Sequence, residues 1–234
     1  MKKQWKYRRN DSMSDIVERD YRTLLVMSRF GIGLGFGDMT ILQACEAHGV
    51  DPDTFIAVLS TIFDGDDRPP CDISHVSPEG LIDYLSSVHV YYLDCRLPAI
   101  RRGLIEVWDG PESDLSRALI NYYDDLVNSI TKHVHREESE LFPYVRLLSA
   151  GKSTSAYPLF ERFPAKHSPI SDRIAELRRL LIKYYPARDT NRMNDILFEI
   201  HIWEYDMNSH ISVEERLLYP IVESLEHKIA TQTP

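Results

Sequence analysis

The sequence has few cysteines, no long apolar run and a shortage of positive charge, and each shortage excludes a class of protein. Its three cysteines, Cys45, Cys71 and Cys95, are too few and too scattered for a disulfide framework, which predicts free thiols in a reducing compartment. No stretch approaches the roughly 18 apolar residues that a membrane span needs, and the basic start MKKQWKYRRNDS has no apolar segment behind it. We therefore expect a cytoplasmic protein with no membrane partner.

The formal net charge of −9 at pH 7 argues against nucleic acid as a partner, because phosphate backbones are bound by clustered lysine and arginine. Apolar residues make up 43% of the 234 positions and charged residues 27%, a balance typical of a folded, soluble protein. The alternating pattern with a period of two that is typical of strands does not occur convincingly. These features predict an all-α protein, which we expect to be a monomer or a homodimer.

A run of acidic, glycine and proline residues at 64–70 divides the chain, because consecutive prolines force an extended backbone. We predict a small helical N-terminal domain over 1–63, a linker over 64–76 and a larger domain over 77–234. The N-terminal domain is expected to contain three short helices, over 14–30, 40–48 and 52–63. The larger domain contains four longer helical patterns, over 78–108, 114–148, 157–185 and 190–227. Because short connections make neighbouring helices antiparallel, this domain is predicted to be an up-down-up-down four-helix bundle.

One pattern, H-x-x-x-E-E-x-x-L-[FY]-P, occurs twice. It begins at His133 in the second helix of the predicted bundle and at His210 in the fourth. Four residues of an α-helix turn through about 400°, so each histidine shares a face with the first glutamate of its copy, Glu137 or Glu214. H-x-x-x-E alone is a common pattern, but its repetition with the same flanking residues is specific. We therefore predict that each copy supplies one histidine and one glutamate to a shared metal site.

These side chains stand in the apolar stripes of their helices, at positions that core residues would otherwise take. On the second helix the inward stripe is Leu119, Tyr123, Leu126, Ile130, His133, Glu137, Leu141 and Val145. On the fourth it is Ile196, Ile200, Trp203, Met207, His210, Glu214, Leu218, Ile221 and Leu225. The stripes of the first and third helices contain one histidine each, His89 and His167. The predicted ligand set is therefore His89, His133, Glu137, His167, His210 and Glu214.

A bare core of this composition would not be stable. Burying two carboxylates and four imidazoles without partners costs several kcal/mol for each charged group. The whole free energy of unfolding of a protein is only about 5–15 kcal/mol. A pair of metal cations removes the conflict, because each glutamate can bridge both ions and each imidazole can donate a neutral nitrogen. Mixed nitrogen and oxygen ligands in a helix bundle, with no cysteine among them, favour iron over zinc and leave manganese open. We therefore predict a centre of two iron ions, oxo-bridged when oxidised.

Four polar residues close to the predicted ligands are interpreted differently. His135 falls on the polar side of the second helix, and Glu138 and Glu215 each follow a ligand by one residue and are expected to face solvent. His201 lies off the inward stripe and is interpreted as a surface residue or as a neighbour of the ligands. For the ligand set itself, the alternative is a core that is polar by coincidence, and the repeated motif argues against it.

The region from about Leu81 to Glu226, with its two copies of the motif, resembles the hemerythrin-like HHE domain, and more closely the iron–sulfur cluster repair di-iron proteins. The resemblance extends to the N-terminal domain through Gly31-Ile32, Ala44-Cys45 and Gly49-Val50-Asp51-Pro52. It implies that the four histidines of the predicted set are terminal ligands and that the two glutamates bridge the ions. This is the same set that the apolar periodicity selects.

In one respect the sequence departs from that family. The family's N-terminal domain usually carries two adjacent cysteines shortly after the Gly-Ile pair, and here Gly35 and Phe36 stand at those positions. Cys45 is the only thiol left in the predicted N-terminal domain. Thiol exchange or iron hand-over by such a pair is therefore not expected, and any repair activity would use the di-iron site alone or Cys45 with an outside thiol.

The resemblance implies a stress-response protein that repairs or protects iron–sulfur clusters damaged by nitric oxide or oxidants, with damaged iron–sulfur proteins as partners. A second hypothesis is a module that binds or senses oxygen or nitric oxide. A third is a redox enzyme such as a nitric oxide reductase or a peroxidase, and a fourth is a purely structural bundle. The sequence contains no obvious acid–base catalyst beside the predicted ligands, so a metal-binding repair protein is favoured over a conventional enzyme.

Overall fold

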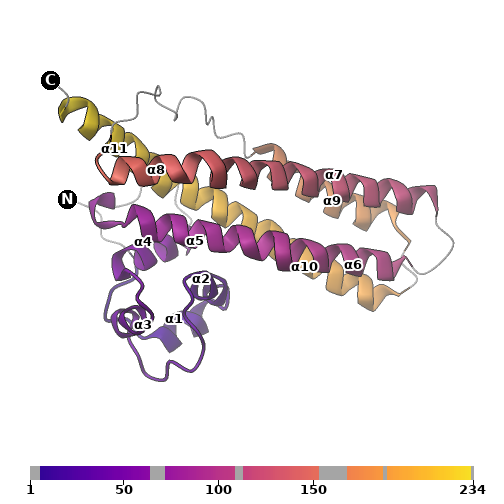
Figure 1. Ribbon diagram of the computed structural model, residues 1–234. Helices are drawn as coiled ribbons and strands as arrows, with labels where there is room; N and C mark the ends of the chain where they lie inside the picture. Colours follow the sequence, from indigo (N-terminus) through magenta and orange to yellow (C-terminus); the bar gives the residue numbers. More distant parts are fainter. Residues whose placement is uncertain (1–5, 64–71, 109–112, 153–167, 187–188, 233–234) are drawn as a thin grey trace. The chain divides into compact units, whose positions relative to one another are not determined.

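The computed structural model describes residues 6–63, 72–108, 113–152, 168–186 and 189–232 (Figure 1). Within these ranges the regular elements are all helical, which confirms the prediction of an all-α protein. None of the described helices is both long enough and apolar enough to cross a membrane. The prolines of the predicted linker and the beginning of the predicted third bundle helix, with His167, lie outside the described residues.

The chain divides into two compact units. Unit 1 comprises Met1–Val88, Glu140–Pro164 and Ser209–Pro234, and unit 2 comprises His89–Ser139 and Ala165–Asn208. The predicted division at 63/64 and 76/77 follows the sequence, whereas these units follow spatial contacts, and the three-part division stays a prediction.

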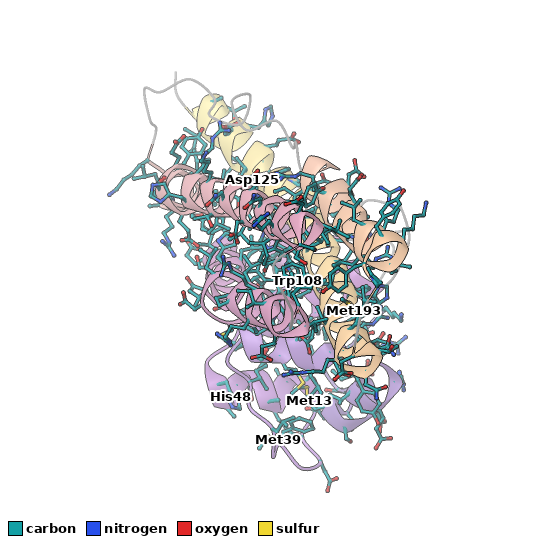
Figure 2. The ribbon with its side chains drawn as sticks, turned by 90° about the vertical axis from the view of Figure 1, so that its right-hand side faces the viewer. Met13, Met39, His48, Trp108, Asp125 and Met193 are labelled. Carbon is teal, nitrogen blue, oxygen red and sulfur yellow. The ribbon has the colours of Figure 1, made fainter. Side chains whose placement is uncertain are left out.

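Unit 1 begins with four short helices: α1 (Met13–Arg19), α2 (Thr23–Arg29), α3 (Ile41–His48) and α4 (Pro52–Phe63). Met13, labelled in Figure 2, is fully buried at the start of α1. The prediction of one helix over 14–30 was wrong, because the chain breaks at Asp20. Asp20 has an extended backbone, and its carboxylate accepts hydrogen bonds from the backbone N–H and the guanidinium of Arg22. This local pairing competes with a continuous helix, as short acidic side chains often do.

Helix α4 is the central element of unit 1. Its residues from Thr54 to Thr61 are all buried, so every face of the helix is covered. It contacts α2, α3, the 3₁₀ turn η1 (Ile73–His75) and the π-helical segment η5 (Glu214–Leu218). The guanidinium of Arg216 in η5 donates a hydrogen bond of 3.0 Å to the backbone carbonyl of Thr61. The N-terminal helices therefore pack directly on the C-terminal copy of the repeated motif.

In the described part of unit 1, the remaining helical segments are α8 (Phe142–Ser149), α11 (Tyr219–Gln232), the part of α5 (Pro78–Val90) that ends at Val88, and residues 209–213 before η5. Helices α8 and α11 are in contact, and the hydroxyl of Tyr144 bonds to the carboxylate of Glu226. Arg146 of α8 pairs with Asp83 of α5 at 3.2 Å.

In the described part of unit 2, four helices pack around a common core, and the last of them belongs to unit 2 as far as Asn208. They are α6 (Leu97–Val107), which continues the π-helical segment η2 (Tyr91–Arg96); α7 (Asp114–Arg136), which continues into η3 (Glu137–Leu141); α9 (Ser168–Tyr184); and α10 (Thr190–Val213). Helix α7 contacts both α6 and α9. The core includes the buried aromatic residues Tyr92, Tyr123 and Trp203.

The side-chain contacts of α10 show whether each neighbouring helix runs parallel or antiparallel to it. Glu199 of α10 pairs with Arg96 at the end of η2, and Arg192 pairs with Glu106 of α6. The residue numbers therefore run in opposite directions along the two helices. The two helices approach closely at Gly103, where an added Cβ atom would lie 3.0 Å from the Ile196 side chain and would force this side chain to shift.

Against α9, Glu204 of α10 pairs with Arg178 and Asn208 pairs with Ser171, which is again antiparallel. Helices α6 and α7 are joined by a short connection and are antiparallel as well. The order α6, α7, α9, α10 is therefore up, down, up, down, as predicted.

Candidate metal centre

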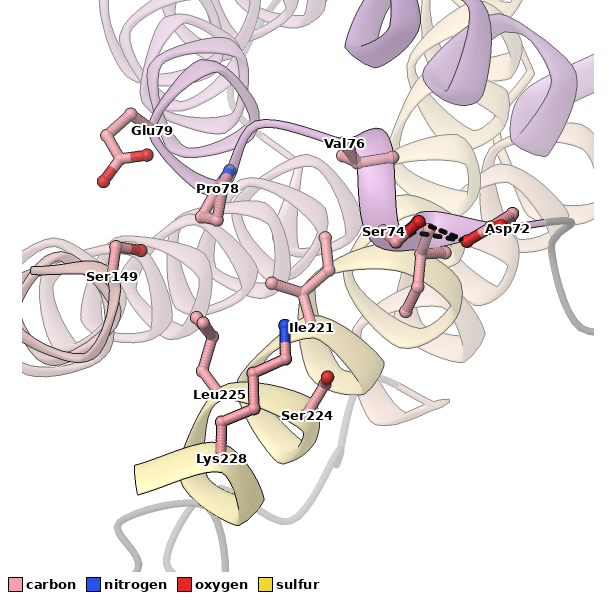
Figure 3. Close-up of a pocket in the computed structure, with 11 residues that line it drawn as sticks. Asp72, Ser74, Val76, Pro78, Glu79, Ser149, Ile221, Ser224, Leu225 and Lys228 are labelled. Carbon is pink, nitrogen blue, oxygen red and sulfur yellow. Dashed lines mark hydrogen bonds between the residues drawn. The ribbon is translucent and has the colours of Figure 1, made fainter. Parts of the chain in front are cut away.

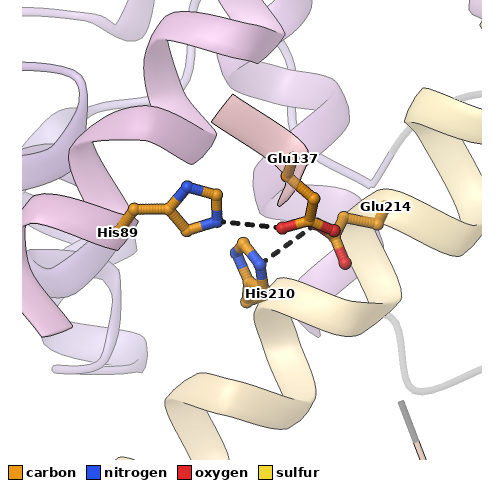
Figure 4. Close-up of side chains that lie close together, drawn as sticks. All are labelled: His89, Glu137, His210 and Glu214. Atoms are coloured by element: carbon orange, nitrogen blue, oxygen red, sulfur yellow. Dashed lines mark ion pairs between the residues drawn. The ribbon is translucent and has the colours of Figure 1, made fainter. Parts of the chain in front are cut away.

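Four buried side chains form a group that could hold a metal ion. His89, Glu137, His210 and Glu214 each offer one ligand atom, and these atoms all lie within 4.8 Å of one another. Figure 4 shows the two imidazoles and the two carboxylates turned toward a common point. Each of the four residues is almost completely buried. All four belong to the ligand set predicted from the sequence.

In unit 2, Glu137 lies between two imidazoles. One carboxylate oxygen faces Nε2 of His133 at 3.2 Å, and the other faces Nε2 of His89 at 3.3 Å. His133 and Glu137 are one turn apart, as the repeated motif predicts. His133 keeps 25% of its side chain exposed, so this edge of the group is open to water.

In unit 1, His210 and Glu214 repeat the same arrangement at the end of α10 and the start of η5. Nε2 of His210 lies 3.1 Å from a carboxylate oxygen of Glu214. The three predicted ligand histidines that the structure describes, His89, His133 and His210, therefore all turn Nε2 toward a carboxylate. The side chain of His210 is only 2% exposed, in contrast to that of His133.

Glu138 contacts a predicted ligand, which the sequence analysis missed. Nδ1 of His89 donates a hydrogen bond of 2.8 Å to the carboxylate of Glu138, whereas Glu138 was expected to face solvent only. The Glu138 side chain is 39% exposed, so it borders both water and the imidazole. A carboxylate on the second nitrogen is the usual partner of a metal-ligating histidine, because it fixes the tautomer and the orientation of the ring.

Each copy of the motif places its glutamate at the start of a π-helical segment. Glu137 is the first residue of η3 and Glu214 is the first residue of η5. A third segment, η2, begins two residues after His89. Such widened turns are rare and occur frequently at functional sites. The first, second and fourth predicted helices are therefore continuous, but each is locally widened at or shortly after a predicted ligand.

The donor set fits a metal centre. Two carboxylates and two imidazoles are buried together, and burial of ionised carboxylates is strongly unfavourable unless cations offset their charge. Imidazole nitrogen together with carboxylate oxygen suits iron, manganese and zinc. When bound, such an ion would supply a Lewis-acidic and, for iron, a redox-active centre.

The other predictions near the ligands have separate outcomes. His167 lies outside the described residues, so its place in the ligand set stays a prediction. His135 is exposed, as predicted. His201 has a side chain that is 68% exposed and lies 3.9 Å from Glu204, which agrees with its interpretation as a surface residue.

A cavity of about 380 Å³ in unit 1 contains none of the predicted ligands (Figure 3). It lies among η1, the start of α5, the end of α8 and α11, and the side chains of Pro78, Ser149 and Leu225 form parts of its wall. The metal-binding group is therefore not part of this surface cavity.

The structure describes two cysteines, one buried and one at the surface. Cys45 is completely buried in α3, and burial raises its pKa to about 12. Because the thiolate is the reactive form, Cys45 is inert near neutral pH. Cys95 is an exposed free cysteine in η2.

A match to a protein family agrees with a cation-binding role for this group. A search of curated proteins found no match. The family model of the hemerythrin HHE cation-binding domain matches residues 97–222, more than half of the chain. The matched segment includes both copies of the repeated motif. The buried histidine–glutamate group and this match lead to one conclusion: the chain belongs to the hemerythrin family of HHE cation-binding domain proteins.

Proposed function

We propose that this protein is a non-haem di-iron protein that repairs or protects iron–sulfur clusters damaged by nitrosative or oxidative stress. The observation that carries the di-iron part is the buried group of His89, Glu137, His210 and Glu214. With His133 and His167 added, the set offers six protein ligands, which gives two histidines for each ion and two bridging carboxylates.

The repair role rests on the resemblance of the sequence to the cluster repair di-iron proteins. It would have to operate without the paired cysteines of that family, since Gly35 and Phe36 occupy their positions. Cys45 offers no substitute, because its buried thiol has a pKa of about 12. We therefore assign the activity to the metal centre itself, through iron release or scavenging of the oxidant.

A second candidate function is the binding of a small diatomic ligand such as oxygen or nitric oxide. The partial exposure of His133, at 25% of its side chain, favours it. Small ligands can approach the Glu137 side of the group along this edge, where the imidazole borders water. In this case the protein would store or sense the ligand rather than act on clusters.

Metal analysis tests the di-iron assignment. The full chain, purified after growth with iron in excess, is expected to contain two irons per chain and to show charge-transfer absorption in the near ultraviolet. Glu137→Ala and Glu214→Ala should lose most of this iron, whereas His135→Ala and His201→Ala, matched exposed histidines, should keep it. One ion per chain, a predominance of zinc, or equal iron retention in all four variants would refute the assignment.

Reactivation of an enzyme whose iron–sulfur cluster has been damaged by nitric oxide tests the repair role. Wild type, His201→Ala and Cys45→Ser are expected to reactivate it, and Glu214→Ala is expected to fail. Loss of activity in Cys45→Ser with its iron still bound would mean that the thiol is essential. If iron-loaded wild type binds nitric oxide without restoring the enzyme, the binding function is the correct one.

A further inference from the structure

Each of the three π-helical segments in the described part of the chain ends two residues before a proline. In each case one large apolar or aromatic residue follows the segment, and a proline comes next. The pairs are Leu97-Pro98 after η2, Phe142-Pro143 after η3 and Tyr219-Pro220 after η5. Pro52 and Pro78, by contrast, stand at the first position of the ordinary helices α4 and α5.

The chemistry of proline explains the widened turns. Proline has no N–H, and its ring collides with the carbonyl four residues earlier, so the α-helical hydrogen bond cannot form there. The carbonyls concerned, those of Asp94, Ser139 and Arg216, all lie inside π-helical segments. The helix continues because the backbone N–H of the residue just before the proline donates to the carbonyl five residues earlier, one residue further than in an α-helix.

The structure shows two of these longer bonds, in η2 and in η5. The backbone N–H of Leu97 donates to the carbonyl of Tyr92, and that of Tyr219 donates to the carbonyl of Glu214. Both bonds span five residues, which defines a π turn. In the second motif copy, the acceptor is thus the backbone of a predicted metal ligand.

The widened turn changes which residues share a face. Five residues of an α-helix turn through about 500°, so Phe142 would point about 140° away from Glu137. A π turn brings the fifth residue back almost above the first. In agreement, both members of each such pair are buried: Tyr92 with Leu97, Glu137 with Phe142, and Glu214 with Tyr219.

We propose that Pro143 and Pro220, and to a smaller degree Pro98, are positioning residues of the metal centre. By excluding the α-helical bond, each proline holds a π turn that directs the first residue of the segment and the residue after it toward the same core, and in η3 and η5 that first residue is a predicted ligand. The proposal rests on the metal-binding function proposed above. A plain α-helix could keep either the glutamate or the following aromatic residue facing inward, but not both.

The test uses Pro143→Ala and Pro220→Ala in the full chain, with Pro78→Ala as the matched control. We expect the two variants to bind iron at least tenfold more weakly and with a changed absorption spectrum. The metal-free forms should be as resistant to denaturant as wild type, or more so, because the helix regains a hydrogen bond. Pro98→Ala should show a smaller loss, and Pro78→Ala should keep the wild-type iron affinity and spectrum.

Two results would overturn the proposal: wild-type iron affinity and spectrum in both variants, or a loss of iron affinity that merely parallels a loss of stability in the metal-free protein. Amide hydrogen exchange of the metal-free chains gives a readout that needs no metal. The amides of Phe142 and Tyr219 should change their protection when the proline is replaced, and unchanged protection also contradicts the proposal. If wild type binds no iron, the proposed function fails, but the exchange data still decide whether the prolines hold the π turns.

Discussion

In the first copy of the repeated motif a quarter of the His133 side chain is exposed, whereas in the second copy His210 is sealed from solvent. The residue six positions after each histidine differs in a matching way. Ser139 of the first copy bonds to its own helix, while Arg216 of the second reaches the carbonyl of Thr61 in α4. Two segments of nearly the same sequence thus provide similar ligands in unlike surroundings. The comparison teaches that ligand identity is a local property and that solvent access is not.

The largest expected effect tests this difference in access. His210→Ala should weaken iron binding by more than about 100-fold, since even residues that only support metal ligands contribute about 10–100-fold. His133→Ala should cost less, because water can enter at the exposed edge and take the vacant position. Titration of the metal-free chain with iron measures both affinities, with His201→Ala as the control.

Free imidazole sharpens the same test. It should restore iron binding to His133→Ala more effectively than to His210→Ala, because the cavity left by His133 opens to solvent. Equal rescue of the two variants would show that both copies are equally accessible.

The next effect concerns the second glutamate of each copy. Glu138→Ala should lower iron affinity by about tenfold, because the His89 imidazole loses the carboxylate that fixes its orientation. Glu215→Ala, at the equivalent exposed position of the second copy, should change the affinity little. The same iron titration measures both, and a larger loss in Glu215→Ala would reverse our assignment of the supporting carboxylate.

A smaller effect is expected where the second copy meets the N-terminal helices. Arg216→Ala removes the hydrogen bond to Thr61 and should lower the free energy of unfolding by about 1 kcal/mol. Ser139→Ala, the matched change in the first copy, removes a bond within one exposed turn and should be nearly neutral. Denaturant unfolding of the metal-free chains separates the two, and equal values would mean that α4 gains nothing from Arg216.

The smallest effect lies within the N-terminal helices that pack on the second copy. The hydrogen bond from Arg22 lowers the pKa of Asp20, so this carboxyl stabilises the fold at neutral pH. The contribution is present above the unfolded pKa of about 3.9 and is lost as the pH falls through the lower folded pKa. Asp20→Asn should therefore reduce the unfolding free energy by less than about 1 kcal/mol at pH 7, and the difference should shrink toward pH 2. A difference independent of pH would exclude the carboxylate charge as its cause.

Several features could be predicted from the sequence because they depend on short-range periodicity. Steps of three and four residues placed Glu137 and Glu214 on the buried face of their helices, and the structure has both there. The same reasoning failed between Ser14 and Phe30, because the hydrogen bonds from Arg22 to the carboxylate of Asp20 outweigh helix propensity at that point. The exposure of Glu138 was predicted, but its hydrogen bond to His89 was not, because this contact depends on how another helix packs.

By itself, the sequence determined the helical class, the inward positions of four polar residues and the proline that stands two residues after each described π-helical segment. The four polar residues are His89, Glu137, His210 and Glu214. Each of these follows from local chemistry: the period of the helix, the types of donor atom and the missing N–H of proline. Only the tertiary structure decided that His133 borders water and His210 does not, and that Glu138 reaches His89. Burial and contacts of this kind depend on which distant segment packs against a helix, and α4 lies more than 150 residues from the Arg216 that it meets.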